Sequence, residues 1–195
     1  MASMDFYFDF SSSYSYLALP KLEKLQNEQG VDIKWMPVAL GAIFKANKHP
    51  GPPAAGSPKL KYISRDIERI ADMNGQSYFW PDPFPFNSIT AARIYWHLEN
   101  DDPAQAIAWA KKVFNASFGE GRNCSDPEEL SNLASHAGLD GSALLLAAEE
   151  DSVKDKLKAV TGEAMGRGVF GAPTFFVGDE MFWGADRLDQ AIRLL

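Results

Sequence analysis

The sequence predicts an α/β protein whose sheet comes from both ends of the chain, with a large all-helical insertion between them. Strand patterns occupy residues 4–10 and 31–35, and a helical pattern separates them. Helix signals fill residues 41–151 almost without a strand signal, and the rest of the chain returns to mixed helix and strand. We therefore expect one domain formed by residues 1–40 and 152–195, interrupted by a helical domain of residues 41–151.

The first expected element is a strand over residues 4–10, because its aromatic side chains pack well on a pleated surface. The serines at 11–13 then cap a helix whose apolar stripe continues over residues 14–28. Pro20 lies inside this stripe, so we expect a kink and not a stop. Residues 31–35 alternate apolar and polar side chains, which predicts a second strand, parallel to the first because a helix connects them.

Six further helices are expected, each beginning at a Ser or Asp side chain that can accept a hydrogen bond from the first turn. These starts are Ser57, Ser88, Asp102, the capping box Ser125–Glu128, Asp140 and Ser152. Proline-rich segments at residues 50–56 and 80–87 predict ordered loops. The many apolar residues of the insertion are consistent with a buried core and equally with a homodimer interface.

The C-terminal part predicts a helix over residues 153–167, then two strands and a last helix. The strands, residues 173–177 and 180–183, are joined by the dipeptide Gly-Asp at 178–179, which is typical of a tight hairpin turn. The last helix begins at Asp186. The proline that opens the third strand is typical of a strand end, because proline cannot donate to a ladder.

Composition excludes several classes of function. The chain has 195 residues, 46% of them hydrophobic and 23% charged, which is typical of a globular protein. Its 26 acidic and 19 basic residues give a formal charge of −7, which disfavours nucleic acid as a partner. The single cysteine, Cys124, excludes an internal disulfide, a redox dithiol and a zinc site built on several thiolates, so we expect a bystander thiol and no metal.

The sequence also indicates where the protein acts. Its longest apolar runs are far shorter than the ~20 residues that a membrane helix needs. The opening residues lack the basic segment of a signal peptide, and the last residues are no obvious peroxisomal address. We expect a cytoplasmic protein without a membrane partner.

Five segments of the chain, in order, resemble one protein family. They are residues 6–18 (FYFDFSSSYSYLA), 40–45 (LGAIFK), 118–122 (FGEGR), 169–175 (VFGAPTF) and 183–188 (WGADRL). The order of elements and the proline before the third strand resemble the thioredoxin fold. More narrowly, the five segments are similar to 2-hydroxychromene-2-carboxylate isomerases and kappa-class glutathione transferases, of the DsbA-like thioredoxin superfamily. The resemblance implies an α/β, thioredoxin-like fold with a large all-helical insertion, and glutathione as cofactor.

Ser12 stands where this family has the serine that meets the glutathione sulfur, so the resemblance implies that Ser12 is catalytic. The N–H groups and partial positive charge of a helix start, together with a hydroxyl donor, stabilise thiolate over thiol. Taken alone, the serines at 11–13 favour a simple helix cap. Ser12 and Ser15 have the spacing of a Cys-x-x-Cys pair but carry no sulfur, which excludes dithiol exchange. Ser13 stands where the family usually has proline.

The resemblance also implies the remainder of a glutathione site. Ala172-Pro173 corresponds to a cis-proline junction, where the N–H and C=O of Ala172 are left free to pair with the cysteinyl part of the ligand. A trans proline at the strand start is the alternative. The γ-glutamyl end of glutathione is held by the segment that corresponds to Trp183, Gly184, Ala185 and Asp186. Asp186 is expected to pair with the ligand ammonium and to cap the last helix.

The second substrate leaves a weaker signal. Lys45 is the candidate partner of an organic carboxylate, and a solvated surface lysine is the alternative. Phe86 and Asn87 are candidates for an apolar wall and a polar anchor that hold an aromatic acid, and core packing is the alternative for Phe86.

These residues lead to one functional hypothesis and two alternatives. The hypothesis is a glutathione-dependent isomerase in which the thiolate held by Ser12 adds to an unsaturated aromatic-type carboxylic acid, a bond rotates in the adduct, and elimination returns glutathione. The first alternative is a kappa-class-like glutathione transferase or peroxidase that uses the same site. The second is a non-catalytic thioredoxin-like binding module without redox cysteines.

Overall fold

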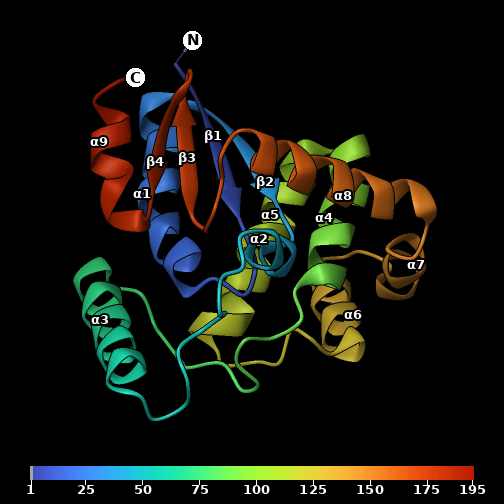
Figure 1. Cartoon of the computed structure of the whole chain (residues 1–195). Helices are drawn as coiled ribbons and strands as arrows, with labels where there is room; N and C mark the ends of the chain where they lie inside the picture. Colours follow the sequence, from blue (N-terminus) through green and yellow to red (C-terminus); the bar gives the residue numbers. More distant parts are fainter. Residues whose placement is uncertain (1) are drawn as a thin grey trace.

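A computed structural model describes residues 2–195, and its centre is a four-stranded sheet in the order β2-β1-β3-β4 (Figure 1). β1 (Ser3–Phe8) pairs in parallel with β2 (Asp32–Pro37). β3 (Thr174–Val177) pairs antiparallel with β1 and forms a hairpin with β4 (Glu180–Trp183). The two ends of the chain therefore build one sheet, as the sequence predicts.

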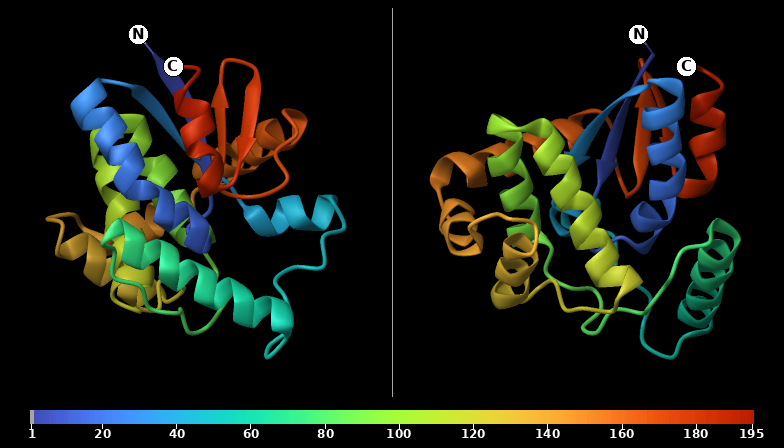
Figure 2. Two further views of the ribbon diagram at one scale, coloured as in Figure 1. Left: turned by 90° about the vertical axis from the view of Figure 1, so that its left-hand side faces the viewer. Right: turned by 180° about the vertical axis from the view of Figure 1, so that it is seen from behind.

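Helices cover both faces of this sheet. α1 (Ser13–Gln29) and α9 (Leu188–Ile192) lie side by side on one face, and α8 (Asp151–Gly166) lies on the other (Figures 1 and 2). α1 continues through Pro20 and ends at Gly30, whose φ of 63° is a left-handed conformation that glycine adopts without cost. This arrangement is a thioredoxin-like fold and confirms the expected fold class.

The segment between β2 and α8 is helical, and within the described residues no strand lies in 41–151. Its elements are α2 (Leu40–Ala46), α3 (Pro58–Asn74), α4 (Ile89–Asp101), α5 (Pro103–Phe114), the π-helix η1 (Asn115–Gly119), α6 (Pro127–Ser135) and α7 (Gly141–Ala147). No helix within residues 2–195 is long and apolar enough to cross a membrane. The sequence therefore predicted the all-helical character of this segment correctly.

The helix starts agree with the sequence at most positions. Hydroxyl or carboxylate oxygens of Ser57, Asp102 and Asp140 accept hydrogen bonds from the first turns of α3, α5 and α7. The capping box expected at Ser125 is wrong by one residue: Asp126 is the N-cap of α6 and accepts from the Glu128 N–H, while the Ser125 hydroxyl donates to Asn123. Ser88 precedes α4, but its side chain makes no cap bond, and Asn87 Oδ1 accepts from the Ile89 N–H instead at 3.1 Å.

Two expected helix boundaries are wrong. Ser152 lies inside α8, which begins at Asp151 with Glu150 as its N-cap residue, because acidic residues suit the positive end of the helix dipole and extend the helix backwards. The last helix does not begin at Asp186: a 3₁₀ turn, η2 (Ala185–Arg187), precedes α9. The Gly184 backbone before it, with φ of 104°, turns the chain sharply, and only afterwards does the helix start.

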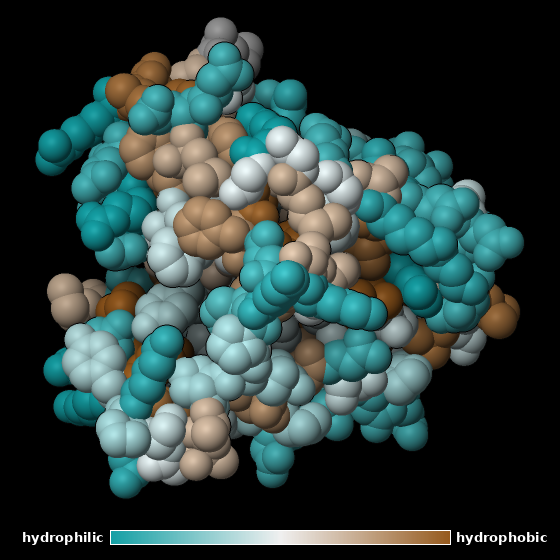
Figure 3. Space-filling view, viewed as in Figure 1, coloured by the Kyte–Doolittle hydropathy of each residue, from teal (hydrophilic) through white to brown (hydrophobic). Residues whose placement is uncertain are grey.

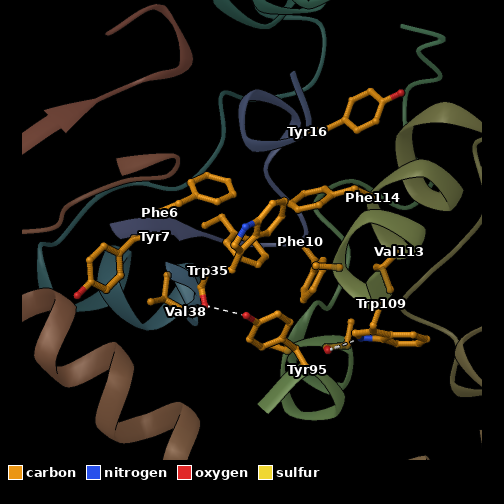
Figure 4. Packing of buried hydrophobic residues seen from close by; sticks show 14 of the residues in the cluster. Phe6, Tyr7, Phe10, Tyr16, Trp35, Val38, Tyr95, Trp109, Val113 and Phe114 are labelled. Carbon is orange, nitrogen blue, oxygen red and sulfur yellow. Dashed lines mark hydrogen bonds between the residues drawn. The ribbon is translucent and has the colours of Figure 1, made fainter. Parts of the chain in front are cut away.

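One aromatic core joins the sheet to the insertion (Figure 4). Phe8 in β1 is fully buried, and its ring contacts Trp35 at 5.7 Å and Phe114 of α5 at 5.4 Å between centroids. α4 covers the free edge of β2, where the Tyr95 hydroxyl and the Trp96 indole N–H donate to backbone carbonyls at 2.9 and 3.1 Å. Many apolar side chains of the insertion are therefore buried in this core. The division into two domains stays a prediction.

We predict that Phe8→Ala lowers the free energy of unfolding by about 3–5 kcal/mol, because it leaves a cavity where sheet and insertion meet. Urea unfolding followed by circular dichroism measures the change. Leu146→Ala is the control, because Leu146 is 75% exposed and its truncation is expected to change stability by less than about 0.5 kcal/mol. A loss in Phe8→Ala no larger than in the control contradicts the shared core.

Candidate functional site

A cavity of about 620 Å³ lies where α1, α3 and the loops around β3 and β4 meet. Apolar side chains reach the surface over β3 and β4 above it, whereas hydrophilic side chains cover α8 (Figure 3). The cavity is lined by Tyr14, Leu17, Ala18, Lys21, Tyr62, Asp66, Ile70, Asn74, Ala172, Pro173, Trp183, Gly184, Ala185, Asp186 and Leu188. All six residues that the sequence assigned to a glutathione site beside Ser12 are therefore brought together here.

Ser12 adjoins this cavity at the start of α1. Its backbone is extended, and its Oγ accepts from the Ser15 N–H at 3.2 Å, so Ser12 is the N-cap of α1. The same hydroxyl donates to the carbonyl oxygen of Ala172, a cavity residue 160 positions later, at 3.1 Å. The Ser12 side chain is therefore both the cap of α1 and a candidate site residue, and Ser12 is 9% exposed.

Asp9 fixes the loop that carries Ser12, and sequence reasoning did not single it out. This carboxylate is 2% exposed. One oxygen accepts from the Ser11 N–H and hydroxyl at 2.8 and 2.7 Å, and the other accepts from the Leu40 N–H at 2.8 Å. Its carbonyl accepts from the Ser12 N–H at 2.9 Å. Asp9 therefore holds the starts of α1 and α2 together beneath the site; an acidic residue inside an otherwise aromatic strand end was the available signal.

The Ala172-Pro173 bond is cis, as expected. One expectation about this junction needs correction: the Ala172 carbonyl is not free, because it accepts the Ser12 hydroxyl. The loop is held from both sides. The Gly184 N–H donates to the Pro173 carbonyl at 2.9 Å, and a Cβ on Gly171 would lie 2.5 Å from the Trp183 indole nitrogen. The close packing of the Trp183 indole on Gly171 therefore holds the cis-proline loop against residues 183–186, the two segments that the sequence assigned to glutathione binding.

Asp186 differs from its expected role in one respect. Its carboxylate does not cap the last helix, since no side chain makes a cap bond at η2 or α9. It folds back over Gly184, where an added Cβ would lie 2.6 Å from one carboxylate oxygen, and its side chain is 69% exposed. The physical reason is the 3₁₀ turn, which directs the carboxylate to the cavity rim and away from the N–H groups of α9. The Arg187 guanidinium lies 3.4 Å from the other carboxylate oxygen, and because both side chains are largely exposed, Asp186 can exchange this partner for a ligand cation.

The wall formed by α1 and α3 was not found from the sequence. The Tyr14 hydroxyl donates to an Asp66 carboxylate oxygen at 3.1 Å, and the Asn74 amide donates to the Leu17 carbonyl at 3.0 Å. Burial and the Asp66 carboxylate raise the pKa of the Tyr14 phenol, so it stays protonated at neutral pH. Because positions 14, 17, 18 and 21 share one helix face, periodicity could have indicated this wall, but it could not tell a cavity wall from core.

The three residues expected at the second substrate do not line the cavity. Lys45 is exposed on α2. Phe86 is 5% exposed and packs against Phe118 with ring centroids 6.0 Å apart, which agrees with its alternative of core packing. Asn87 accepts the Ile89 N–H at the start of α4. Whether these side chains meet in one site depends on contacts between segments that are distant along the chain, and periodicity and motifs do not show such contacts.

Two further groups are not bases or nucleophiles at neutral pH. Tyr78 shares a hydrogen bond of 3.1 Å with the Ser13 hydroxyl, and burial raises the pKa of its phenol to about 12. Cys124 is fully buried, and burial raises the pKa of its thiol to about 11. Within residues 2–195 no group of three or more His, Cys, Asp or Glu side chains is arranged to hold a metal.

Comparisons with known proteins agree with this fold. A family model described as a DSBA-like thioredoxin domain matches residues 3–195. The 2-hydroxychromene-2-carboxylate isomerase of Pseudomonas putida is 36% identical over 187 residues, which cover 95% of this chain and 90% of that protein. Glutathione S-transferase kappa 1 of Caenorhabditis elegans is 24% identical and covers 98% of this chain and 90% of that protein.

A solved structure of 2-hydroxychromene-2-carboxylate isomerase has a TM-score of 0.90 and 33% identity, and the match covers 98% of this chain and 93% of that chain. The chain belongs to the DSBA-like thioredoxin family, and within it to the group formed by the 2-hydroxychromene-2-carboxylate isomerases and their kappa-class relatives. The resemblance seen in the five sequence segments is thereby confirmed.

We predict that Asp9→Asn lowers the free energy of unfolding by about 1–3 kcal/mol, because an amide can accept only one of the two backbone N–H groups and presents a donor to the other. Asp32→Asn is the control, since Asp32 is exposed on β2. Urea unfolding of both variants measures the effect. Equal stabilities of the two variants would contradict the role assigned to Asp9.

We also predict that Cys124 in the folded protein resists alkylation by iodoacetamide at pH 8. With a pKa of about 11, roughly one thiol in a thousand is ionised at this pH, and only the thiolate reacts. Mass spectrometry of the native and the urea-unfolded chain, labelled for the same time, gives the comparison. Similar labelling in both states would show that the thiol is neither buried nor suppressed.

Proposed function

We propose that this protein is a glutathione-dependent isomerase of an unsaturated aromatic-type carboxylic acid. The observation that carries the proposal is the hydrogen bond between Ser12 and Ala172, which places a helix-start hydroxyl beside a cavity lined by the cis-proline junction and by residues 183–186. The name of the P. putida relative, 2-hydroxychromene-2-carboxylate isomerase, supports the reaction class. The kappa-class relative supports glutathione as the cofactor.

The residues present suit glutathione. A thiolate at the start of α1 benefits from the helix dipole and from the Ser12 hydroxyl, which turns its proton from the Ala172 carbonyl to the sulfur. The Ser12 oxygen continues to accept the Ser15 N–H during this change, so the helix cap is kept. The exposed Asp186 carboxylate at the cavity rim suits the ligand ammonium. Apolar side chains such as Leu17 cover the ligand stem.

The chemistry follows from stabilising the thiolate. The sulfur adds to a carbon–carbon double bond of the acid that is conjugated to an electron-withdrawing group, and the former double bond becomes single and rotates. Elimination then re-forms the double bond and releases the thiolate, so glutathione is unchanged. Ser12 acts by electrostatic stabilisation, because it lowers the thiol pKa and holds the sulfur in place.

The second substrate, the location and the assembly belong to the same proposal. Lys45, Phe86 and Asn87 remain candidates for the organic acid, although they lie outside the described cavity. We place the protein in the cytoplasm, and we keep a homodimer as a prediction. We propose neither a metal nor a nucleic acid as a partner.

A kappa-class-like transferase or peroxidase is the second candidate, and the 24% identical relative favours it. It uses the same thiolate site, but its reaction consumes glutathione. The non-catalytic binding module is the remaining alternative, because neither Ser12 nor Ser15 supplies a redox sulfur.

We predict that the wild-type protein binds reduced glutathione and ionises its thiol, and that Ser12→Ala abolishes the ultraviolet thiolate absorbance and lowers isomerase activity at least about 100-fold. Titration calorimetry and difference spectroscopy measure binding and ionisation. Ser135→Ala is the matched control, because this exposed hydroxyl donates to the Ser131 carbonyl in α6, outside the cavity. Absence of glutathione binding by the folded wild type would leave the non-catalytic module.

We predict that consumption of glutathione distinguishes the isomerase from the transferase or peroxidase. With unsaturated aromatic acids as substrates, an isomerase leaves the glutathione concentration constant while the acid changes geometry. Stoichiometric loss of glutathione would instead favour the transferase or peroxidase.

A further inference from the structure

Lys21 is the only cation among the residues that line the cavity, as far as residues 2–195 are concerned. It lies on α1, and its ammonium group contacts an Asp189 carboxylate oxygen of α9 at 2.7 Å. Sequence reasoning gave it no role. Two carboxylates, Asp66 and Asp186, line the same cavity. A lysine among these groups provides a place for a ligand carboxylate that the remainder of the lining would repel.

The distance along α1 suits one particular carboxylate of glutathione. Tyr14, Leu17, Ala18 and Lys21 follow the same helix face towards the far end of the cavity. Ser12 and Lys21 are nine residues apart, which is about 13 Å along the helix axis. In extended glutathione the sulfur and the γ-glutamyl α-carboxylate are about 9 Å apart. With a charge-assisted hydrogen bond of about 3 Å at each end, and with the length of the Lys21 side chain, the ligand is long enough to reach from Ser12 to the Lys21 ammonium.

The two opposite charges come from neighbouring elements, α1 and η2, and both groups line the cavity. Asp189, the present partner of Lys21, comes one helical turn after Asp186, so the Lys21 ammonium is held near the segment that carries Asp186. The Lys21 and Asp189 side chains are 44% and 67% exposed. Exposed ion pairs contribute little to stability, so Lys21 can bind a ligand carboxylate without loss to the fold.

We propose that Lys21 and Asp186 form a zwitterion clamp, in which Lys21 binds the α-carboxylate of the γ-glutamyl residue and Asp186 binds its α-ammonium. This inference rests on the proposed glutathione site and adds a specificity residue to it. Because the two protein groups approach from α1 and from η2, the clamp suits a ligand that carries both charges on the same carbon. The clamp fixes the direction of glutathione, with its sulfur at Ser12.

The test compares two ligands that differ only in this carboxylate: glutathione, and γ-aminobutyryl-cysteinylglycine, which keeps the amine and lacks the carboxylate. We expect Lys21→Gln to weaken glutathione binding about tenfold, the loss typical of one charge-assisted bond. The same variant should bind the carboxylate-free ligand as tightly as the wild type does. Titration calorimetry at a fixed salt concentration gives all four affinities.

Lys24→Gln is the matched control, because Lys24 lies one turn further along α1, pairs with Glu28 at 3.9 Å and is absent from the cavity lining. It removes the same charge and should leave both affinities unchanged. Equal weakening of both ligands by Lys21→Gln, or no weakening, overturns the clamp while the glutathione site stands. Failure of the wild type to bind glutathione overturns the clamp and the proposed function together.

Discussion

The buried carboxylate of Asp9 is the contact on which the site depends. It accepts from backbone N–H groups of two segments, at Ser11 and at Leu40, and its own carbonyl accepts from Ser12. A buried carboxylate is tolerated only where such donors surround it. The need to satisfy this charge therefore fixes the end of β1, the start of α1 and the start of α2 in one arrangement. The position of the Ser12 hydroxyl follows from that arrangement.

Ser12 then connects the two ends of the chain. Its hydroxyl caps α1 through Ser15 and reaches the cis-proline loop through Ala172. β1 and β3 are antiparallel neighbours in the sheet. The loop that follows β1 and the loop that precedes β3 therefore meet at the same end of the sheet. Replacement of sulfur by oxygen at this meeting point removes redox chemistry and leaves a hydrogen-bond donor at a positive helix end. Such a site suits a thiolate supplied by a ligand.

The polar and charged groups at the cavity are arranged along α1. The Ser12 hydroxyl, at the start of α1, adjoins the cavity beside Ala172, and Lys21, further along α1, lines the cavity and pairs with Asp189. Between them the wall is formed by one face of α1 and by α3, which is held against α1 by the Tyr14 and Asn74 hydrogen bonds. An elongated ligand with an anionic sulfur at one end and a zwitterion at the other complements this pattern.

Period-two and period-3.6 patterns, together with caps and turn residues, determined the order of strands and helices, since these signals are local. Motif resemblance likewise located Ser12, the cis-proline junction and residues 183–186. Only the tertiary structure decided that α1 and α3 enclose a cavity, that Asp9 organises the loops, that the Ala172 carbonyl is engaged, and that Lys21 faces the site while Phe86 packs in the core. The physical reason is that periodicity tells which side chains share a face, whereas packing between distant segments decides whether that face meets core, cavity or water.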